Sequence, residues 1–94
     1  MRSTERTVRN PSGLHARPAA MFVRTAASFT SKITLENLER ESAPVDAKSI
    51  LMVMGSGVST GHRIRVTADG DDEAEAIATI ETFIDGGMGE TIPG

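Results

Sequence analysis

A histidine and an arginine follow a glycine turn in the segment NPSGLHARPAAM, residues 10–21. The neutral imidazole of His15 is a nitrogen nucleophile, and the guanidinium of Arg17 binds phosphate oxygens through paired hydrogen bonds. Pro18 is typical of the first turn of a helix, and the free N–H groups and dipole of a helix start stabilise an anion. These residues could therefore accept and hold a phosphoryl group. A surface histidine without a role has the same spacing, so both interpretations stand at this point.

Ser49, in the segment DAKSIL, is a second candidate. It lies in the first turn of a predicted helix for which Asp46 is the expected N-cap. A phosphate on its hydroxyl would be favoured by the helix dipole and by Lys48, and opposed by Asp46. An unmodified first-turn serine is the alternative.

The other motifs are weaker evidence of a functional site. The stretch GSGVSTG, residues 55–61, lacks the Gly-Lys-Ser/Thr ending of a phosphate-binding loop. Its Gly-x-Ser-x-Gly match follows a helix and precedes a strand, the reverse of a nucleophile elbow, so we interpret it as a turn. His62 could pair with His15 as a metal ligand, but no further ligand stands at a suitable spacing. We predict no metal site and no cofactor.

The bulk composition limits the function classes. The chain has 94 residues, a net charge of −3, no basic run and no cysteine. This argues against nucleic acid as the main partner and excludes disulfides and thiol catalysis. No segment has the length and apolarity of a signal peptide or a membrane span. We expect a single cytoplasmic domain over residues 1–94, without membrane insertion, acting as a monomer.

Hydrophobic periodicity predicts the order β-α-β-β-α-β-α. The expected strands are 3–9, 32–36, 43–45 and 62–68, and the expected helices are 17–28, 46–54 and 69–85. Half-buried strands of this kind favour an α+β fold, with a four-stranded antiparallel sheet and three helices on one face. The tail, residues 88–94, is expected to be frayed.

Two segments carry a family resemblance. The sequence GLHARPA, residues 13–19, resembles the active-centre signature of HPr, the family of histidine-containing phosphocarriers of the bacterial phosphoenolpyruvate-dependent sugar phosphotransferase system. The sequence KSILMVM, residues 48–54, is similar to the regulatory-serine helix of that family. The resemblance covers nearly the whole chain and implies an open-faced two-layer sandwich.

The resemblance also implies roles and partners. His15 would be phosphorylated on its δ nitrogen, with Arg17 contacting the phosphoryl group. Enzyme I would donate the phosphoryl group, and enzyme IIA domains of sugar permeases would accept it. Ser49 would match the serine that a dedicated kinase and phosphorylase modify in some bacteria. The implied docking residues on the second helix are Ile50, Leu51 and Met54.

The chain departs from the family pattern in several places. The connection 36–42 is about three residues longer than usual, and Met52 stands where a glycine is frequent. A regulatory binding module of the same fold is the alternative function. It would act in carbon or nitrogen regulation through Ser49 and a transcription regulator. A stand-alone hydrolase or transferase using His15 is the third possibility, and it lacks an assigned acid to orient the imidazole.

Overall fold

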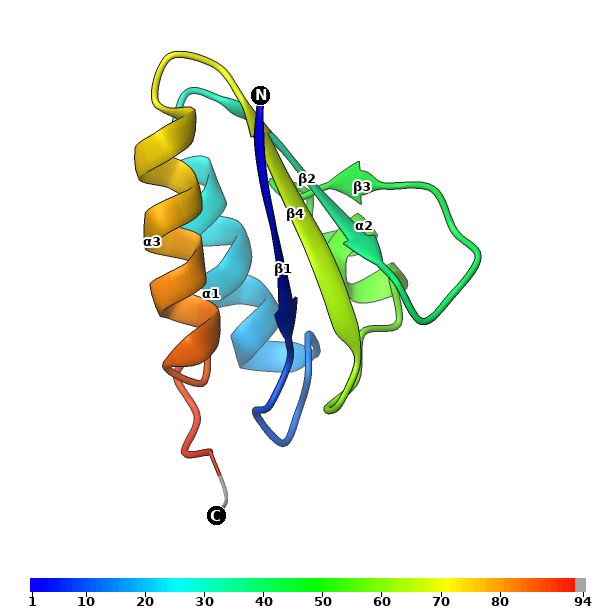
Figure 1. Ribbon diagram of the computed structural model, residues 1–94. Helices are drawn as coiled ribbons and strands as arrows, with labels where there is room; N and C mark the ends of the chain where they lie inside the picture. Colours follow the sequence, from blue (N-terminus) through cyan, green and yellow to red (C-terminus); the bar gives the residue numbers. More distant parts are fainter. Residues whose placement is uncertain (93–94) are drawn as a thin grey trace.

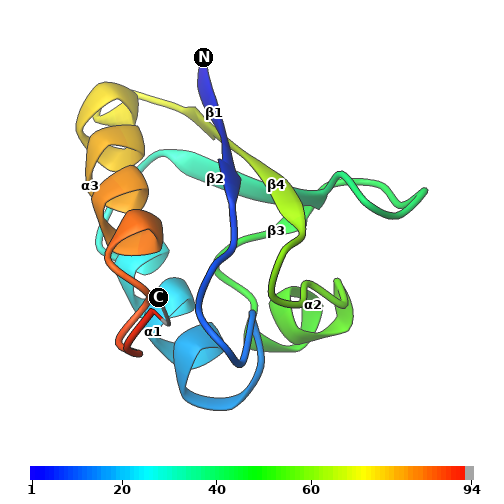
Figure 2. The same ribbon diagram turned by 60° about the horizontal axis from the view of Figure 1, so that its bottom comes forward.

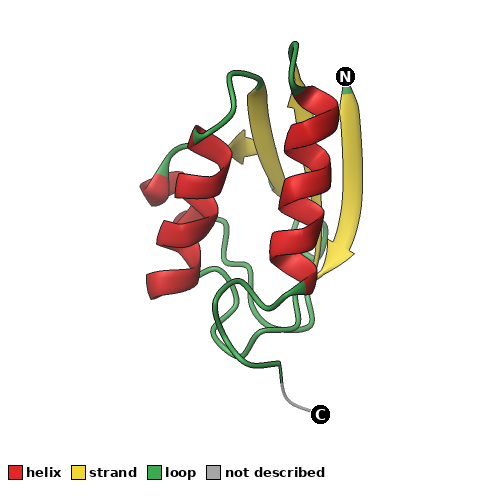
Figure 3. Ribbon diagram, turned by 90° about the vertical axis from the view of Figure 1, so that its left-hand side faces the viewer, coloured by secondary structure: helices red, strands yellow, loops and turns green. Residues whose placement is uncertain are grey.

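The computed structural model describes residues 1–92 and confirms the predicted order of elements. The elements are β1 (Arg2–Thr7), α1 (Ala16–Ala27), β2 (Lys32–Asn37), β3 (Val45–Asp46), α2 (Ile50–Gly55), β4 (Arg63–Asp69) and α3 (Glu73–Asp85) (Figure 1). The strands form one sheet in the order β1-β4-β2-β3, and every neighbouring pair is antiparallel. The helices form a layer on one face of this sheet (Figure 3), which confirms the predicted two-layer α+β sandwich.

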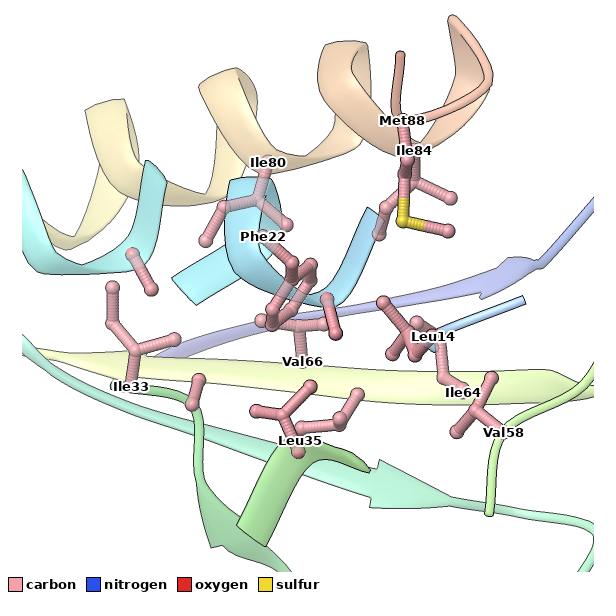
Figure 4. Close-up of a cluster of buried hydrophobic side chains, with 14 of the residues drawn as sticks. Leu14, Phe22, Ile33, Leu35, Val58, Ile64, Val66, Ile80, Ile84 and Met88 are labelled. Carbon is pink, nitrogen blue, oxygen red and sulfur yellow. The ribbon is translucent and has the colours of Figure 1, made fainter. Parts of the chain in front are cut away.

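Alternation along the strands builds the core. In β2 and β4, every second residue is buried beneath the helices and the residues between them are more exposed. Phe22 of α1 and Ile80 of α3 pack onto this buried face, close to Val66 (Figure 4). The open face is polar instead, and Arg65 joins Glu5 at 2.9 Å and Glu36 at 3.1 Å across three strands. The sheet therefore leaves its polar face uncovered without exposing apolar side chains.

The start of α2 corrects one prediction. Ser49, not Asp46, is the N-cap, and its hydroxyl oxygen accepts a hydrogen bond from the Met52 amide at 3.3 Å. Asp46 cannot cap this helix because it belongs to β3, where it pairs with Thr34. Its carboxylate accepts a hydrogen bond from the Lys48 amide at 2.9 Å. Residues 47–48 form a turn after β3, and Ser49 itself is extended (φ −108°, ψ 113°), so the helix begins later than predicted.

The tail corrects a second prediction, because residues 88–90 are well anchored. Gly87, Met88 and Gly89 all have positive φ, at 93°, 52° and 87°, and fold the chain back towards the core. Met88 is only 1% exposed and lies beside Ile84 (Figure 4). Burial of this side chain holds the segment in place. Residues 93 and 94 lie outside the described residues, so the prediction for them is not addressed.

A carboxylate joins two loops at the end of the molecule drawn at the top of Figure 1. Asp72, which precedes α3, accepts hydrogen bonds from the amides of Thr30 and Ser31 at 2.8 and 2.9 Å, and from the Ser31 hydroxyl. The Ser31 hydroxyl, followed by the Thr30 amide, lowers the pKa of Asp72 from 3.8 to about 2. The α1–β2 loop is thus tied to the start of α3.

This clamp predicts a pH dependence of stability. A carboxyl whose pKa is lower in the folded chain stabilises the fold above its ordinary pKa, and this stabilisation is lost as the pH falls towards the folded value. The free energy of unfolding should therefore drop between about pH 4 and pH 2, and it should drop less steeply in Asp72→Asn. Urea titrations of both proteins across this range measure the two slopes. Equal slopes would contradict the assignment.

Candidate functional site

His15 occupies the N-cap position of α1. Its backbone is extended (φ −122°, ψ 160°), and its side chain does not cap the helix. The residue is exposed. The imidazole is therefore accessible and not engaged in a capping hydrogen bond, as a nucleophile must be.

The next residue has an unusual backbone. Ala16 has φ 49°, in the left-handed region that residues with a Cβ rarely adopt, at a cost on the order of 1–3 kcal/mol. The chain thus turns sharply between His15 and the rest of α1. Surrounding structure must hold this conformation, because the residue alone would avoid it.

The start of α1 offers an anion site beside the imidazole. Arg17 lies exposed in the first turn, and this turn contains no acidic residue. The first N–H groups of a helix have no carbonyl partner within it, and they lie at the positive end of the dipole. Within residues 1–92, Arg17 forms no ion pair. Its guanidinium can therefore contact a phosphoryl group on His15.

The turn before His15 is held by hydrogen bonds within the turn and by one to the loop that precedes β4. The Asn10 side-chain amide donates to the Gly13 carbonyl at 2.9 Å, and the Gly13 amide donates to the Asn10 carbonyl at 3.2 Å. The Leu14 amide donates to the Val58 carbonyl at 3.0 Å, and the Leu14 side chain is fully buried. The 55–61 stretch, which we interpreted as a turn, therefore supports the residues just before His15.

Glu90, which was not among the predicted site residues, contacts the same turn. Its carboxylate accepts hydrogen bonds from the Asn10 side-chain amide at 2.9 Å, the Ser12 amide at 3.0 Å and the Ser12 hydroxyl at 2.8 Å. These hydrogen bonds, with that from Asn10 the largest, hold the pKa of Glu90 below its ordinary value. The available signal was the sequence GGMGE at 86–90, in which glycines surround one apolar residue just before an acid.

An apolar surface lies on the helix next to α1. Its members, here called the α2 patch, are Ile50, Leu51, Met52 and Met54, with exposed fractions of 39%, 81%, 45% and 40%. Val53 alone turns into the core. Helices α1 and α2 contact each other (Figure 2). An exposed apolar patch of this kind is typical of a protein docking surface, and Met52 extends the predicted set.

Ser49 lies immediately before the α2 patch. Its side chain is half-buried, and its hydroxyl caps α2. Lys48, which we expected to face a phosphate at Ser49, instead donates from its ammonium to the Phe29 carbonyl at 2.7 Å. A phosphate at Ser49 would therefore meet the start of α2 without this lysine beside it.

The second histidine, His62, hydrogen-bonds within the loop before β4. His62 accepts a hydrogen bond on Nδ1 from the Ser59 amide at 3.1 Å. Among residues 1–92, no group of three or more His, Asp or Glu side chains could hold a metal ion. In the same range, no helix combines the length and apolarity that a membrane crossing requires.

The fold and the site define a small α+β protein that presents a histidine at a helix start, beside an exposed apolar helix. The family model described as "PTS HPr component phosphorylation site" matches residues 2–85. The chain therefore belongs to the HPr family of phosphocarrier proteins of the phosphotransferase system.

Known proteins agree with this assignment. The multiphosphoryl transfer protein of Haemophilus influenzae is 48% identical over 86 residues, covering 92% of this chain and 17% of that protein. The HPr-like protein Crh of Bacillus subtilis is 43% identical over 77 residues, covering 82% of this chain and 87% of Crh. The crystal structure of HPr-C-His from Thermoanaerobacter tengcongensis has a TM-score of 0.90 and 42% identity, and it covers 98% of this chain and 100% of that one. The chain spans 17 to 23% of the multiphosphoryl transfer proteins that it matches.

The turn before His15 predicts an effect of adding a single methyl group. A Cβ on Gly13 would lie 2.5 Å from the Val58 carbonyl oxygen, and the backbone there has φ 59°. We expect Gly13→Ala to lower the free energy of unfolding by about 1–3 kcal/mol. Urea unfolding followed by circular dichroism measures the change.

Gly55→Ala is the matched control. Gly55 lies in α2, and a Cβ there would meet nothing within 4 Å. Alanine favours a helix over glycine, so this variant should gain up to about 1 kcal/mol. Similar losses in the two variants would show that the contact with Val58 does not constrain the turn.

Proposed function

We propose that His15 accepts a phosphoryl group from phospho-enzyme I and passes it to an enzyme IIA domain during sugar uptake. The observation that carries this proposal is the exposed imidazole at the N-cap of α1, which forms no capping hydrogen bond. The HPr family assignment over residues 2–85 supports it. The chain acts as a monomeric phosphocarrier that needs no metal or cofactor of its own.

The transfer step depends mainly on position and charge. A lone pair on Nδ1 of His15 attacks the phosphorus, and the bond from phosphorus to enzyme I breaks as the new P–N bond forms. Arg17 and the free N–H groups of α1 stabilise the phosphoryl oxygens. The hold must be loose, because interactions that stabilise only the bound state would slow the onward transfer to enzyme IIA.

The partners supply alignment through the α2 patch. Ile50, Leu51 and Met54 bury apolar area against enzyme I and against enzyme IIA, one after the other. Docking excludes water and aligns the phosphoryl group with its acceptor. A small apolar contact is suited to a complex that must dissociate after each transfer.

Regulation through Ser49 is the second part of the proposal. A phosphate there would replace the hydroxyl that caps α2 and would add negative charge at the edge of the α2 patch. A serine kinase and phosphorylase would control it. The alternative is a regulatory module of the same fold that binds a transcription regulator. The likeness to Crh, whose structure is described as that of a catabolite repression protein, favours this second candidate.

Three single substitutions, at the two histidines and at Arg17, test the carrier function. We expect His15→Ala to abolish phosphorylation by enzyme I and phosphoenolpyruvate, because no other group supplies the nucleophile at α1. Arg17→Ala should slow phosphorylation by roughly 10²-fold, as the loss of one transition-state donor does. His62→Gln is the control and should react at the wild-type rate. Intact-mass spectrometry over time measures all three.

The fold of each variant must be checked by circular dichroism. His15 and Arg17 are exposed, so both substitutions should leave the fold intact. If His15→Ala still accepted a phosphoryl group at the wild-type rate, His15 would not be the carrier.

A charge at Ser49 should weaken docking. We expect Ser49→Asp to raise the Kd for enzyme I by about tenfold, because docking would remove the new carboxylate from water at the rim of an apolar contact. Thr79→Asp adds the same charge at an exposed position of α3, away from the α2 patch, and should leave the Kd unchanged. Calorimetric titration measures both. Equal weakening would assign the effect to net charge and not to this site.

A further inference from the structure

The segment after α3 has an unusual backbone conformation. Gly87, Met88 and Gly89 have positive φ in succession, which is unfavourable for a residue with a Cβ such as Met88. A Cβ on Gly87 would lie 2.2 Å from the Glu90 carbonyl oxygen, and one on Gly89 would lie 2.7 Å from the Met21 sulfur. Glycine at these two positions lets the chain reverse closely against α1. The reversal directs Glu90 back towards the turn that precedes α1.

All the side-chain hydrogen bonds of the Glu90 carboxylate within residues 1–92 are made with that turn. Oε1 accepts from the Asn10 side-chain amide and from the Ser12 amide, and Oε2 accepts from the Ser12 hydroxyl. The partners lie 78 and 80 residues away in the sequence. All three donors are neutral, and Glu90 forms no ion pair within residues 1–92. Hydrogen bonds to a charged acceptor are shorter and stronger than those between neutral groups.

Anchoring of the tail does not require these bonds. Met88 is buried, and its amide donates to the Phe83 carbonyl at 3.1 Å, while the Glu90 amide donates to the Gly87 carbonyl at 2.9 Å. Contacts other than those of the carboxylate therefore also hold the segment against α3 and the core. The carboxylate adds a constraint on the turn.

The constrained turn leads directly to the reactive histidine. The Asn10 amide that donates to Glu90 also donates to the Gly13 carbonyl, so one side chain links Glu90 to the residue two before His15. Leu14 is held by the Val58 carbonyl and by burial. Within the turn, Glu90 forms hydrogen bonds with Asn10 and Ser12 and not with Gly13 or Leu14.

We propose that Glu90 is a positioning residue for phosphoryl transfer, which holds the 10–14 turn through Asn10 and Ser12 so that His15 is presented in its reactive orientation. This inference rests on the proposed function of His15. Glu90 does not contact the phosphoryl group. It acts on the barrier by fixing where the imidazole starts, and transfer of a phosphoryl group is sensitive to small misplacements of the nucleophile.

Glu90→Gln tests the proposal. The side-chain amide keeps the shape of the carboxyl group, but it replaces one acceptor with a donor that faces Asn10 or Ser12. We expect kcat for phosphorylation by enzyme I to fall by about tenfold, while KM stays within about twofold because the α2 patch is intact. Asp72→Asn is the matched control. It weakens a similar carboxylate clamp at the opposite end of the molecule (Figure 1) and should change neither constant.

A second readout does not depend on phosphorylation. In ¹H–¹⁵N spectra of the unphosphorylated protein, Glu90→Gln should shift or broaden the signals of the His15 ring and the Ser12 amide. Asp72→Asn should leave both signals in place. If the wild-type protein accepted no phosphoryl group, the proposed function would fail, and these spectra would still decide whether Glu90 positions His15.

Three results would overturn the positioning role. The first is a kcat for Glu90→Gln equal to that of Asp72→Asn. The second is a higher KM with unchanged kcat, which would place Glu90 in docking. The third is a set of His15 ring signals in Glu90→Gln that coincide with those of the wild-type protein.

Discussion

The left-handed backbone of Ala16 is the constraint on which the reactive end of the molecule depends. It allows His15 to remain extended and outside α1 while the helix begins at the very next residue. The imidazole and the free N–H groups of the helix start are therefore neighbours along the chain, yet the imidazole does not hydrogen-bond to these N–H groups. A residue with a Cβ does not hold this conformation by itself, so the segments around it must impose it.

Two distant segments and one local side chain hold the turn that precedes Ala16. The loop before β4 supplies the Val58 carbonyl, Asn10 braces the turn from within, and the tail after α3 brings the Glu90 carboxylate. These segments converge because the sheet order β1-β4-β2-β3 sets the start of β4 beside the end of β1. Asp72 joins the loops at the other end of the same layer. The sandwich is thus a scaffold with a clamp at each end, and one of these clamps adjoins the reactive histidine.

Local patterns predicted what local physics determines. Alternation in 32–36 and 62–68 predicted β2 and β4, and the spacing of Ala19, Phe22 and Ala26 predicted α1, because each of these faces has to be buried. The failures lie where distant residues decide. Pairing of Asp46 with Thr34 moved the cap of α2 to Ser49, and burial of Met88 ordered a tail that composition marked as frayed. His15 and Arg17 were visible as a motif, whereas Glu90 becomes visible only when the chain is folded.

The most direct test of the account is the chemistry of the phosphoryl bond in the wild-type protein. Intact-mass spectrometry after incubation with phosphoenolpyruvate, enzyme I and Mg²⁺ counts the adducts, and treatment with acid or with base follows. A phosphoryl group on an imidazole nitrogen is lost in acid and kept in base. The account predicts one adduct that acid removes and base leaves in place. The absence of any adduct, or an adduct that survives acid as a phosphoserine does, would contradict the role of His15 as the carrier.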